Sequence, residues 1–491
     1  MIYKNPVIKG FYPDPSVCQA NGKYYLVTST FQYFPGVALF ESDDLVNWDQ
    51  IGYVLTRSEQ VELENINSSG GVFAPTIRYN DGRFYMVTTN DTTHKNFYVY
   101  TDDIYGDWSD PIGVDQGGID PSLYFEDGRT YFMSNGTDEE GKSGVIQCEI
   151  DINTGKKLTK SKCIWQGSGG RYLESPHLYK IGDRYYLMAA EGGTEYGHMI
   201  TLARAETVWG EFESCPYNPI LTNRNKAPFI IQGIGHGDLV YDKNGGLFII
   251  SLGFRQIHMW MPYHNLGREV FLTPARITGD GWIEAGADGT TDESYEIAGD
   301  FTQKPLKTYT FENTDVNIDW CFMRIPAKEN YELSKERFVL HGTEVTLDDV
   351  ASPTFIALRQ RDHVFEMQAD VTVTDGEGGI TIFMDENEHY EIALRKNENG
   401  SCEAILRLNI GGIKHIQNAL PVGGGSARLI VKGDCLNYTF SAEINGKTVT
   451  LGSGGTKYIS SEVSGGFTGA MTGLYAVGGT AGFENFKVQY K

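Results

Sequence analysis

The chain has 491 residues, with 41 Lys and Arg against 64 Asp and Glu, which gives a formal net charge of −23. So large an excess of negative charge disfavours binding to nucleic acid or to an anionic membrane through broad electrostatics, and a neutral ligand fits better. The length predicts two or three domains, and the apolar content is sufficient for each of them to bury a core.

The N-terminal segment and the cysteines bear on the compartment. The segment MIYKNPVIKGFYPDP has no apolar h-region and the chain has no run of eighteen apolar residues, so we expect neither an export signal nor a membrane span. The seven cysteines are scattered and form no Cys-x-x-Cys pair. We therefore expect reduced thiols in a cytoplasmic protein, although prior removal of an export signal would leave the same pattern.

One pattern recurs five times in the first 255 residues. Each copy begins with a short motif and runs through a Gly-containing turn into an apolar strand; the motifs are FYPDPSV, VFAPTIRY, GIDPSLYF, LESPHLYK and GHGDLVY, starting at residues 11, 72, 118, 173 and 235. Repeats of about 40–60 residues made of short strands indicate a propeller, because each sheet buries its faces against the neighbouring sheets. Five copies predict five blades, with the strand before each turn beside the central channel.

Three of the five motifs carry a carboxylate at or next to the same position, namely Asp14, Asp120 and Glu174. Equivalent residues of different blades face one end of the channel, so we expect the three side chains to converge there. Asp-Pro is also ordinary turn chemistry, which would explain one such site; three at one register favour a functional site. His236 takes the position of Glu174 in the fifth copy, where a single His is more often a structural residue than a ligand.

After residue 255 the repeat fades, and we expect the fifth blade to close through residues 267–286, with the N-terminal segment as a candidate closing strand. Residues 287–310 are rich in Asp, Gly and Thr, as a linker would be, and we expect the linker itself at 296–310. Short alternating strands with turn signals follow, and they predict a β-sandwich over 311–491. The fold class is therefore all-β, with a five-bladed β-propeller over 1–295 followed by a β-sandwich domain.

These motifs, in this order and spacing, together with QGIGHGDLV and LGREVFLTP, resemble the glycoside hydrolase family 43 β-xylosidases and α-L-arabinofuranosidases that carry a C-terminal concanavalin-like β-sandwich. The likeness spans nearly the whole chain. It implies an inverting, exo-acting glycoside hydrolase that releases xylose or arabinose from short xylan- or arabinan-derived oligosaccharides. No cofactor is required for this chemistry, and whether the chain forms a homo-oligomer stays open.

The resemblance implies a role for each carboxylate. It makes Asp14 the general base, Glu174 the general acid, and Asp120 the residue that orients the acid and raises its pKa. Inversion needs one carboxylate to activate water and one carboxylic acid for the leaving oxygen, with the carboxyls about 6.5–9.5 Å apart. The role of Asp120 also has a basis outside the family, because a neighbouring carboxylate disfavours the ionised form of an acid and so raises its pKa.

The resemblance further implies that Arg268 reaches the innermost sugar, that Phe31 and Phe73 form apolar walls, and that His236 lies beside a calcium or sodium ion. On the residues alone, a salt bridge that holds the last blade explains Arg268 equally well, and aromatic residues beside strands usually belong to the core. A hard cation with a single His among waters would be structural and not catalytic.

The chain departs from its relatives at three positions near these motifs. Phe73, Thr76 and Ser175 stand where relatives typically have Trp, Asp and Gly. The departures leave the three carboxylates intact, but they leave the preference between xylose and arabinofuranose open.

The β-sandwich has two interpretations, a carbohydrate-binding accessory module or a wall that closes the pocket. In relatives a loop of this domain carrying an aromatic residue reaches the propeller and yields exo action. The segment GGFTGAMTGLYA at 465–476 is apolar and Gly-rich enough for such a contact, and Phe467 is the candidate.

Three other functions compete. A retaining fructan hydrolase would use an NDPNG-type motif and an EC motif, where this chain has PDPSV and ESP. A phosphorylase would need basic residues around the pocket, and the loops that open the repeats are not notably basic. A propeller that only binds sugar would not repay the cost of converging three carboxylates.

Overall fold

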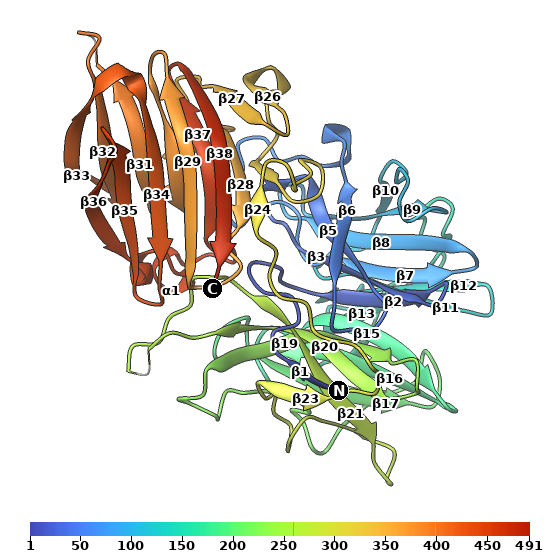
Figure 1. Cartoon of the computed structure of the whole chain (residues 1–491). Coiled ribbons are helices and arrows are strands. Elements are labelled where there is room, and N and C mark those ends of the chain that lie inside the picture. The colour runs from blue at the N-terminus through green and yellow to red at the C-terminus, as the bar shows by residue number, and fades with distance from the viewer. Residues whose placement is uncertain (259, 398) are drawn as a thin grey trace.

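The computed structural model describes residues 1–258, 260–397 and 399–491, and strands make up almost all of its regular structure (Figure 1). Five four-stranded antiparallel sheets are followed by two eight-stranded sheets. The predicted all-β fold, a five-bladed propeller with a C-terminal β-sandwich, is confirmed. No helix among the described residues is both long and apolar enough to cross a membrane.

Each blade is built from strands that are consecutive along the chain, except that one two-residue strand within the first blade's segment belongs to another sheet. The blades are β2 (Ser16–Ala20), β3 (Lys23–Thr28), β5 (Gly36–Ser42) and β6 (Asp49–Leu55); β7 (Thr76–Asn80), β8 (Arg83–Asn90), β9 (Lys95–Thr101) and β10 (Ile112–Val114); β11 (Ser122–Glu126), β12 (Arg129–Thr137), β13 (Ser143–Ile150) and β14 (Lys162–Trp165); β15 (Glu174–Ile181), β16 (Arg184–Glu191), β17 (Met199–Ala205) and β18 (Glu213–Ser214); and β19 (Ile231–Tyr241), β20 (Leu247–Arg255), β21 (Glu269–Ile277) and β22 (Ile283–Ala285).

The first strand of every blade lies at the centre of the ring. β2 contacts β7 and β19, β11 contacts β7 and β15, and β15 contacts β19. Because each motif of the repeat runs directly into one of these strands, the motifs gather around the channel, as the repeat predicts.

The N-terminal segment does not supply a strand to the fifth blade, so the candidate closing strand is wrong. β1 (Ile2–Lys4) pairs instead with β23 (Ser294–Glu296), and β19 to β22 complete the blade by themselves. Ile8 forms an isolated bridge to Val270 in β21. The N-terminus therefore fastens the outside of the last blade, and Figure 1 shows it beside β23.

The β-sandwich consists of two sheets around one apolar core. The first contains β26 (Tyr331–Leu333), β27 (Arg337–His341), β38 (Thr480–Tyr490), β29 (Phe365–Val373), β34 (Ser426–Gly433), β35 (Asn437–Ile444) and β36 (Lys447–Gly455), with β24 (Tyr309–Thr310) against β38; the second contains β33 (Ile413–Val422), β32 (Cys402–Ile410), β31 (His389–Lys396), β30 (Glu377–Phe383), β37 (Met471–Val477), β28 (Thr354–Arg359), β25 (Cys321–Met323) and β4 (Tyr33–Phe34). In β29, apolar residues at every second position are buried, which is the period of a strand with one face in a core.

A strand of the propeller belongs to the sandwich. β4 lies between β3 and β5 in the chain, but it pairs with β25 at the edge of the second sheet. Next to this edge, Phe11, Phe31 and Tyr33 of the propeller join Phe355 and Tyr475 of the sandwich in one buried cluster. The two domains therefore share apolar core at the side of the propeller that carries the first repeat motif.

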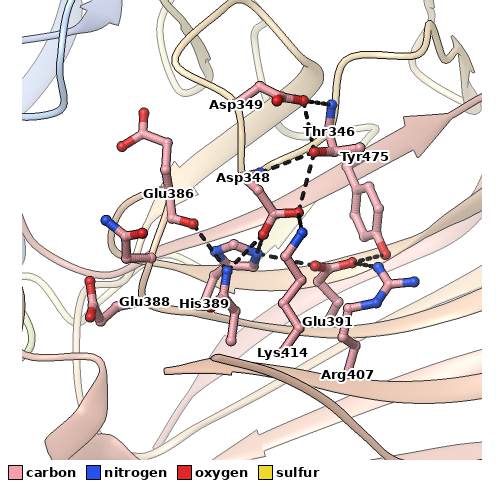
Figure 2. A network of polar contacts seen from close by, with 12 residues as sticks. Thr346, Asp348, Asp349, Glu386, Glu388, His389, Glu391, Arg407, Lys414 and Tyr475 are labelled. Atoms are coloured by element: carbon pink, nitrogen blue, oxygen red, sulfur yellow. Dashed lines mark hydrogen bonds and ion pairs between the residues drawn. The ribbon is translucent and has the colours of Figure 1, made fainter. Parts of the chain in front are cut away.

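The face of the second sheet opposite the sandwich core is partly apolar, where it joins the cluster shared with the propeller, and partly polar. The strap, the segment of residues 342–353, covers some of the polar part (Figure 2). Asp348 of the strap lies 3.5 Å from the Nε2 atom of His389, accepts a hydrogen bond of 2.7 Å from Asn409 and pairs with Lys414. Because the His389 side chain is fully buried, this part of the face is not open to a ligand.

Candidate active site

The repeat motifs share an unusual backbone conformation. Asp14, Asp120, Ser175 and His236 have φ angles of 56°, 52°, 54° and 41°. Residues other than glycine in this left-handed region are strained, and such residues gather at functional sites. Four of the five motifs therefore hold a strained backbone residue at the same end of the channel.

The backbone corrects the alignment of His236. The sequence places this residue opposite Glu174, whereas its positive φ places it opposite Ser175. The shift follows from irregular pairing in β19, whose register slips between Gln232 and Gly235 and again between Gly235 and Gly237.

Every residue that the sequence predicts for the site lines one pocket of about 80 Å³. The structure adds Ala74, Ile119, Thr194 and His198; the full lining is Asp14, Phe31, Phe73, Ala74, Ile119, Asp120, Glu174, Thr194, His198, His236, Arg268 and Phe467. Ala74 occupies the repeat position of Asp14 and Asp120, so the register could have indicated it.

A much larger groove, of about 1060 Å³, lies where the N-terminal segment meets the linker. By volume alone, this groove would be the candidate site. However, it contains none of the three carboxylates, and its charged lining includes ordinary exposed ion pairs such as Lys304 with Asp49. The small pocket is therefore the candidate active site.

Asp14 is held as an anion. Its Oδ1 atom lies 3.1 Å from Nη1 of Arg268 and 3.6 Å from Nδ1 of His236, and its Oδ2 atom accepts a hydrogen bond from the Ser29 hydroxyl. Burial alone would raise the pKa of Asp14, but these neighbours outweigh burial and hold the pKa below its ordinary value.

The pKa values of Glu174 and Asp120 shift in the opposite direction, upward. Burial, and then the charge of Asp14, raise the pKa of Glu174 to about 7, although Arg268 opposes the shift. Burial, then Glu174 and Asp14, raise the pKa of Asp120 well above its ordinary value. Because the two acids repel one another, they titrate as a pair that keeps a proton to higher pH than an isolated carboxyl would.

Arg268 links three walls of the pocket. Its Nη1 donates to Asp14 and, over 2.8 Å, to the hydroxyl of Thr194, and its Nη2 donates over 3.1 Å to the backbone oxygen of Phe467. The two interpretations of this residue are thus compatible, since its salt bridge to Asp14 lies inside the pocket.

Three phenylalanines form the apolar side. The ring centre of Phe31 lies 5.5 Å from that of Phe73 and 5.8 Å from that of Phe467. Phe467 follows α1 (Ser461–Ser464) of the sandwich, is 41% exposed, and is held by a 2.8 Å hydrogen bond from its backbone N–H to Ser69. This contact favours the interpretation of the sandwich as a wall of the pocket.

His236 does not bring a ready-made metal site with it. Burial lowers its pKa, so the ring is neutral near pH 7, with Asp14 and Asp120 as its acidic neighbours at 3.6 and 4.0 Å. Among the described residues, no group of three or more His, Cys, Asp or Glu is placed to hold a metal ion. The protein ligands therefore do not fit a multi-ligand cation site.

Comparison with known proteins decides the family. Residues 3–283 match the family described as glycosyl hydrolases family 43, and residues 308–489 match the β-xylosidase C-terminal concanavalin A-like domain. The chain belongs to glycoside hydrolase family 43. It is therefore a glycoside hydrolase.

Several relatives align over most of their length. The non-reducing end α-L-arabinofuranosidase BoGH43B of Bacteroides ovatus is 37% identical over 97% of this chain and 91% of its own. A xylosidase/arabinosidase of Butyrivibrio fibrisolvens is 33% identical over 97% and 96%. Among solved structures, the Bacteroides ovatus xyloglucan PUL GH43B superposes with a TM-score of 0.93 at 35% identity, with full coverage of both chains.

Proposed function

We propose that this glycoside hydrolase is inverting and exo-acting, and that it releases a terminal xylose or arabinofuranose from short xylan- or arabinan-derived oligosaccharides. The observation that carries the proposal is the opposite tuning of carboxylates in one small pocket, with the pKa of Asp14 lowered and that of Glu174 raised to about 7. Acid–base pairs of this kind are what glycoside inversion requires. The names of the relatives support pentose as the sugar.

In the proposed reaction, ionised Asp14 takes a proton from a water molecule while the water oxygen bonds to the anomeric carbon. The bond from this carbon to the leaving oxygen breaks, and Glu174 donates its proton to that oxygen. Asp14 ends protonated and Glu174 ionised, and proton exchange with solvent restores both. Asp120, paired with Glu174, keeps that proton in place at neutral pH.

The remaining lining residues hold the sugar. The rings of Phe31, Phe73 and Phe467 offer apolar surface to one sugar face, and Arg268 offers N–H groups at the Asp14 side. Because the sandwich contributes Phe467, the pocket suits one terminal sugar and not the middle of a chain.

Two further properties belong to the proposal. A calcium or sodium ion beside His236 would take most of its ligands from water and would be structural. A cytoplasmic location is supported by the seven cysteines, all of which are unpaired. A phosphorylase is disfavoured, because Arg268 is the only Lys or Arg among the described lining residues and it already pairs with Asp14.

The test is hydrolysis of 4-nitrophenyl β-xyloside and 4-nitrophenyl α-L-arabinofuranoside by the wild-type protein. We expect turnover of at least one of them, and the ratio of the two kcat/KM values gives the sugar preference. Failure to cleave either one, together with failure on the corresponding disaccharides, would contradict the proposal.

A further inference from the structure

The loop of residues 166–173 leads directly into Glu174, which lines the pocket. It connects β14 to β15, and Glu174 is the first residue of β15. In the proposed reaction Glu174 donates its proton to the leaving oxygen, so the leaving group lies on the side of this residue. The chain just before Glu174 is therefore well placed to contact the leaving group.

A buried carboxylate fixes this loop. Glu191, at the end of β16, accepts hydrogen bonds of 2.7 Å from the backbone N–H of Ser168, 2.6 Å from that of Gly170 and 2.8 Å from the hydroxyl of Thr201. The backbone N–H of Gly192 donates to the oxygen of Arg171 over 2.7 Å. A Cβ atom at residue 170 would lie 2.5 Å from Oε2 of Glu191, so only glycine fits at this contact.

On this fixed loop, Tyr172 presents its ring to solvent. Its backbone has a φ of 54°, which is costly for a bulky side chain, and the residue is 60% exposed. The guanidinium carbon of Arg171 lies 5.2 Å from the ring centre, and the same group pairs with Glu195 at 3.2 Å. The ring thus has a cationic neighbour although it is not buried.

The ring also lies against the neighbouring segment that follows β16. A Cβ atom built on Gly193 would lie 3.2 Å from Cδ2 of Tyr172, which shows that the ring packs against that glycine. The next residue, Thr194, lines the pocket and accepts a hydrogen bond from Arg268. Tyr172 therefore lies between the segment of the acid and the segment that holds Arg268.

The tyrosine hydroxyl is available. Tyr105 and Tyr217 are similarly exposed, at 61% and 63%, but their hydroxyls donate to Glu41 and Asp280. Within the described part of the chain, the hydroxyl of Tyr172 has no such protein partner. An exposed aromatic face with a free hydroxyl matches the apolar face and the hydroxyl groups of a sugar ring.

The geometry points to Tyr172 as the platform on which the sugar of the leaving group stacks, directly outside the pocket for the terminal pentose. Arg171 supports the ring from one side. The inference rests on the proposed function, since it takes the position of the leaving group from the role of Glu174.

The test compares two substrates that both need proton donation by Glu174, of which only one has a leaving ring. For the Tyr172→Ala variant, we expect kcat/KM on xylobiose to fall about 5- to 10-fold, the usual range for one aromatic contact, and kcat/KM on methyl β-xyloside to stay within about twofold. Tyr172→Trp should restore kcat/KM on xylobiose to near the wild-type value. Tyr217→Ala is the control and should change kcat/KM on neither substrate, because Tyr217 is similarly exposed, follows the last strand of its blade and does not line the pocket. If the wild type prefers arabinofuranose, the matching arabinosides replace the xylosides.

Two outcomes would overturn the inference. Equal losses of kcat/KM on the disaccharide and on the methyl glycoside would mean that the substitution displaces Glu174. An unchanged kcat/KM on the disaccharide would mean that the ring of Tyr172 does not contact the leaving sugar. Failure of the proposed function gives a different result, because the wild type would then cleave neither substrate.

Discussion

The carboxyl of Asp14 is buried and that of Glu174 is partly buried, yet their neighbours shift the two pKa values in opposite directions. Arg268 and His236 lower the pKa of Asp14. Burial and the negative charge of Asp14 raise the pKa of Glu174 to about 7. A site that binds sugar without cleaving it has no need of such a difference.

The first prediction concerns Asp14→Asn. The amide keeps the shape of the side chain but accepts no proton, so kcat should fall by at least about 100-fold, the lower end of the usual effect of general-base removal. Steady-state kinetics with 4-nitrophenyl glycosides will measure this, and an unchanged melting temperature shows that the fold is kept. Retention of more than about a hundredth of wild-type activity would exclude Asp14 as the base.

The second prediction concerns Glu174→Gln. Phenols of low pKa leave without a proton, whereas alcohols and sugars need one, so the loss in kcat/KM should be small for dinitrophenyl glycosides and large, about 100-fold or more, for disaccharides. A series of aryl glycosides with graded leaving groups measures the dependence. Equal losses across the series would contradict the role of Glu174 as the acid.

The third prediction concerns pH. Glu174 must be protonated to act, so its raised pKa sets the basic limb of the kcat/KM profile near pH 7. Asp120→Asn removes one source of repulsion, so the limb should move to lower pH, but not to the value of an isolated glutamic acid, because burial and Asp14 remain. A limb that stays in place or moves upward would reduce Asp120 to a positioning residue.

At the scale of elements, the sequence predicts the features that belong to the repeat and does not predict those outside it. The five blades and the convergence of Asp14, Asp120 and Glu174 follow from a motif whose period and register are local properties of the chain. Thr194 and His198 come after β16, outside the motif, so nothing in the repeat marks them. The pairing of β1 with β23 and of β4 with β25 joins segments almost 300 residues apart, which no local pattern reveals.

The polar face of the sandwich gives the fourth prediction (Figure 2). Arg407 pairs with Glu391 and, at 2.7 Å, with Glu377. The single hydroxyl of Tyr475 lies 2.6 Å from Glu391 and 2.8 Å from Glu377, within hydrogen-bonding distance of either carboxylate. Arg407→Met would leave the largely buried Glu377 without a cation and Glu391 with His389 as its remaining cationic partner, so we expect a loss of about 3 kcal/mol in the free energy of unfolding. Denaturant unfolding measures this, with the exposed Arg129→Met as the control at about 0.5 kcal/mol or less.

The same network is expected to contribute to the acid stability of this domain. Burial alone would raise the pKa of Glu391, but His389 and Arg407 outweigh burial and lower it to about 2. The stability that comes from this depressed pKa is complete above the unfolded-state value of about 4.3 and is lost as pH falls toward 2. The Arg407→Met variant should show a weaker dependence on pH over this range, and an unchanged dependence would mean that other groups govern acid unfolding.

At the scale of the whole molecule, the two domains build one pocket. Arg268 of the propeller donates to the backbone of Phe467 in the sandwich, and Ser69 of the propeller accepts from the same residue. Phe467→Ala keeps these backbone bonds but removes the ring, so KM for an aryl pentoside should rise about tenfold while kcat changes by less than about threefold. Tyr458→Ala is the control, since this sandwich residue is 42% exposed and lies outside the pocket lining. Equal KM values for the wild type and Phe467→Ala would mean that the sandwich does not form the sugar site.

The configuration of the first-formed sugar tests the central claim most directly. Proton NMR of the wild-type reaction, recorded in the first minutes before the released pentose mutarotates, separates the two anomers. An inverting pair of Asp14 and Glu174 predicts that a β-xyloside yields α-xylose first, and that an α-L-arabinofuranoside likewise yields the opposite anomer. Initial release of the sugar with the configuration of the substrate would contradict the account, because a water molecule activated by Asp14 can attack only from the face opposite the leaving group.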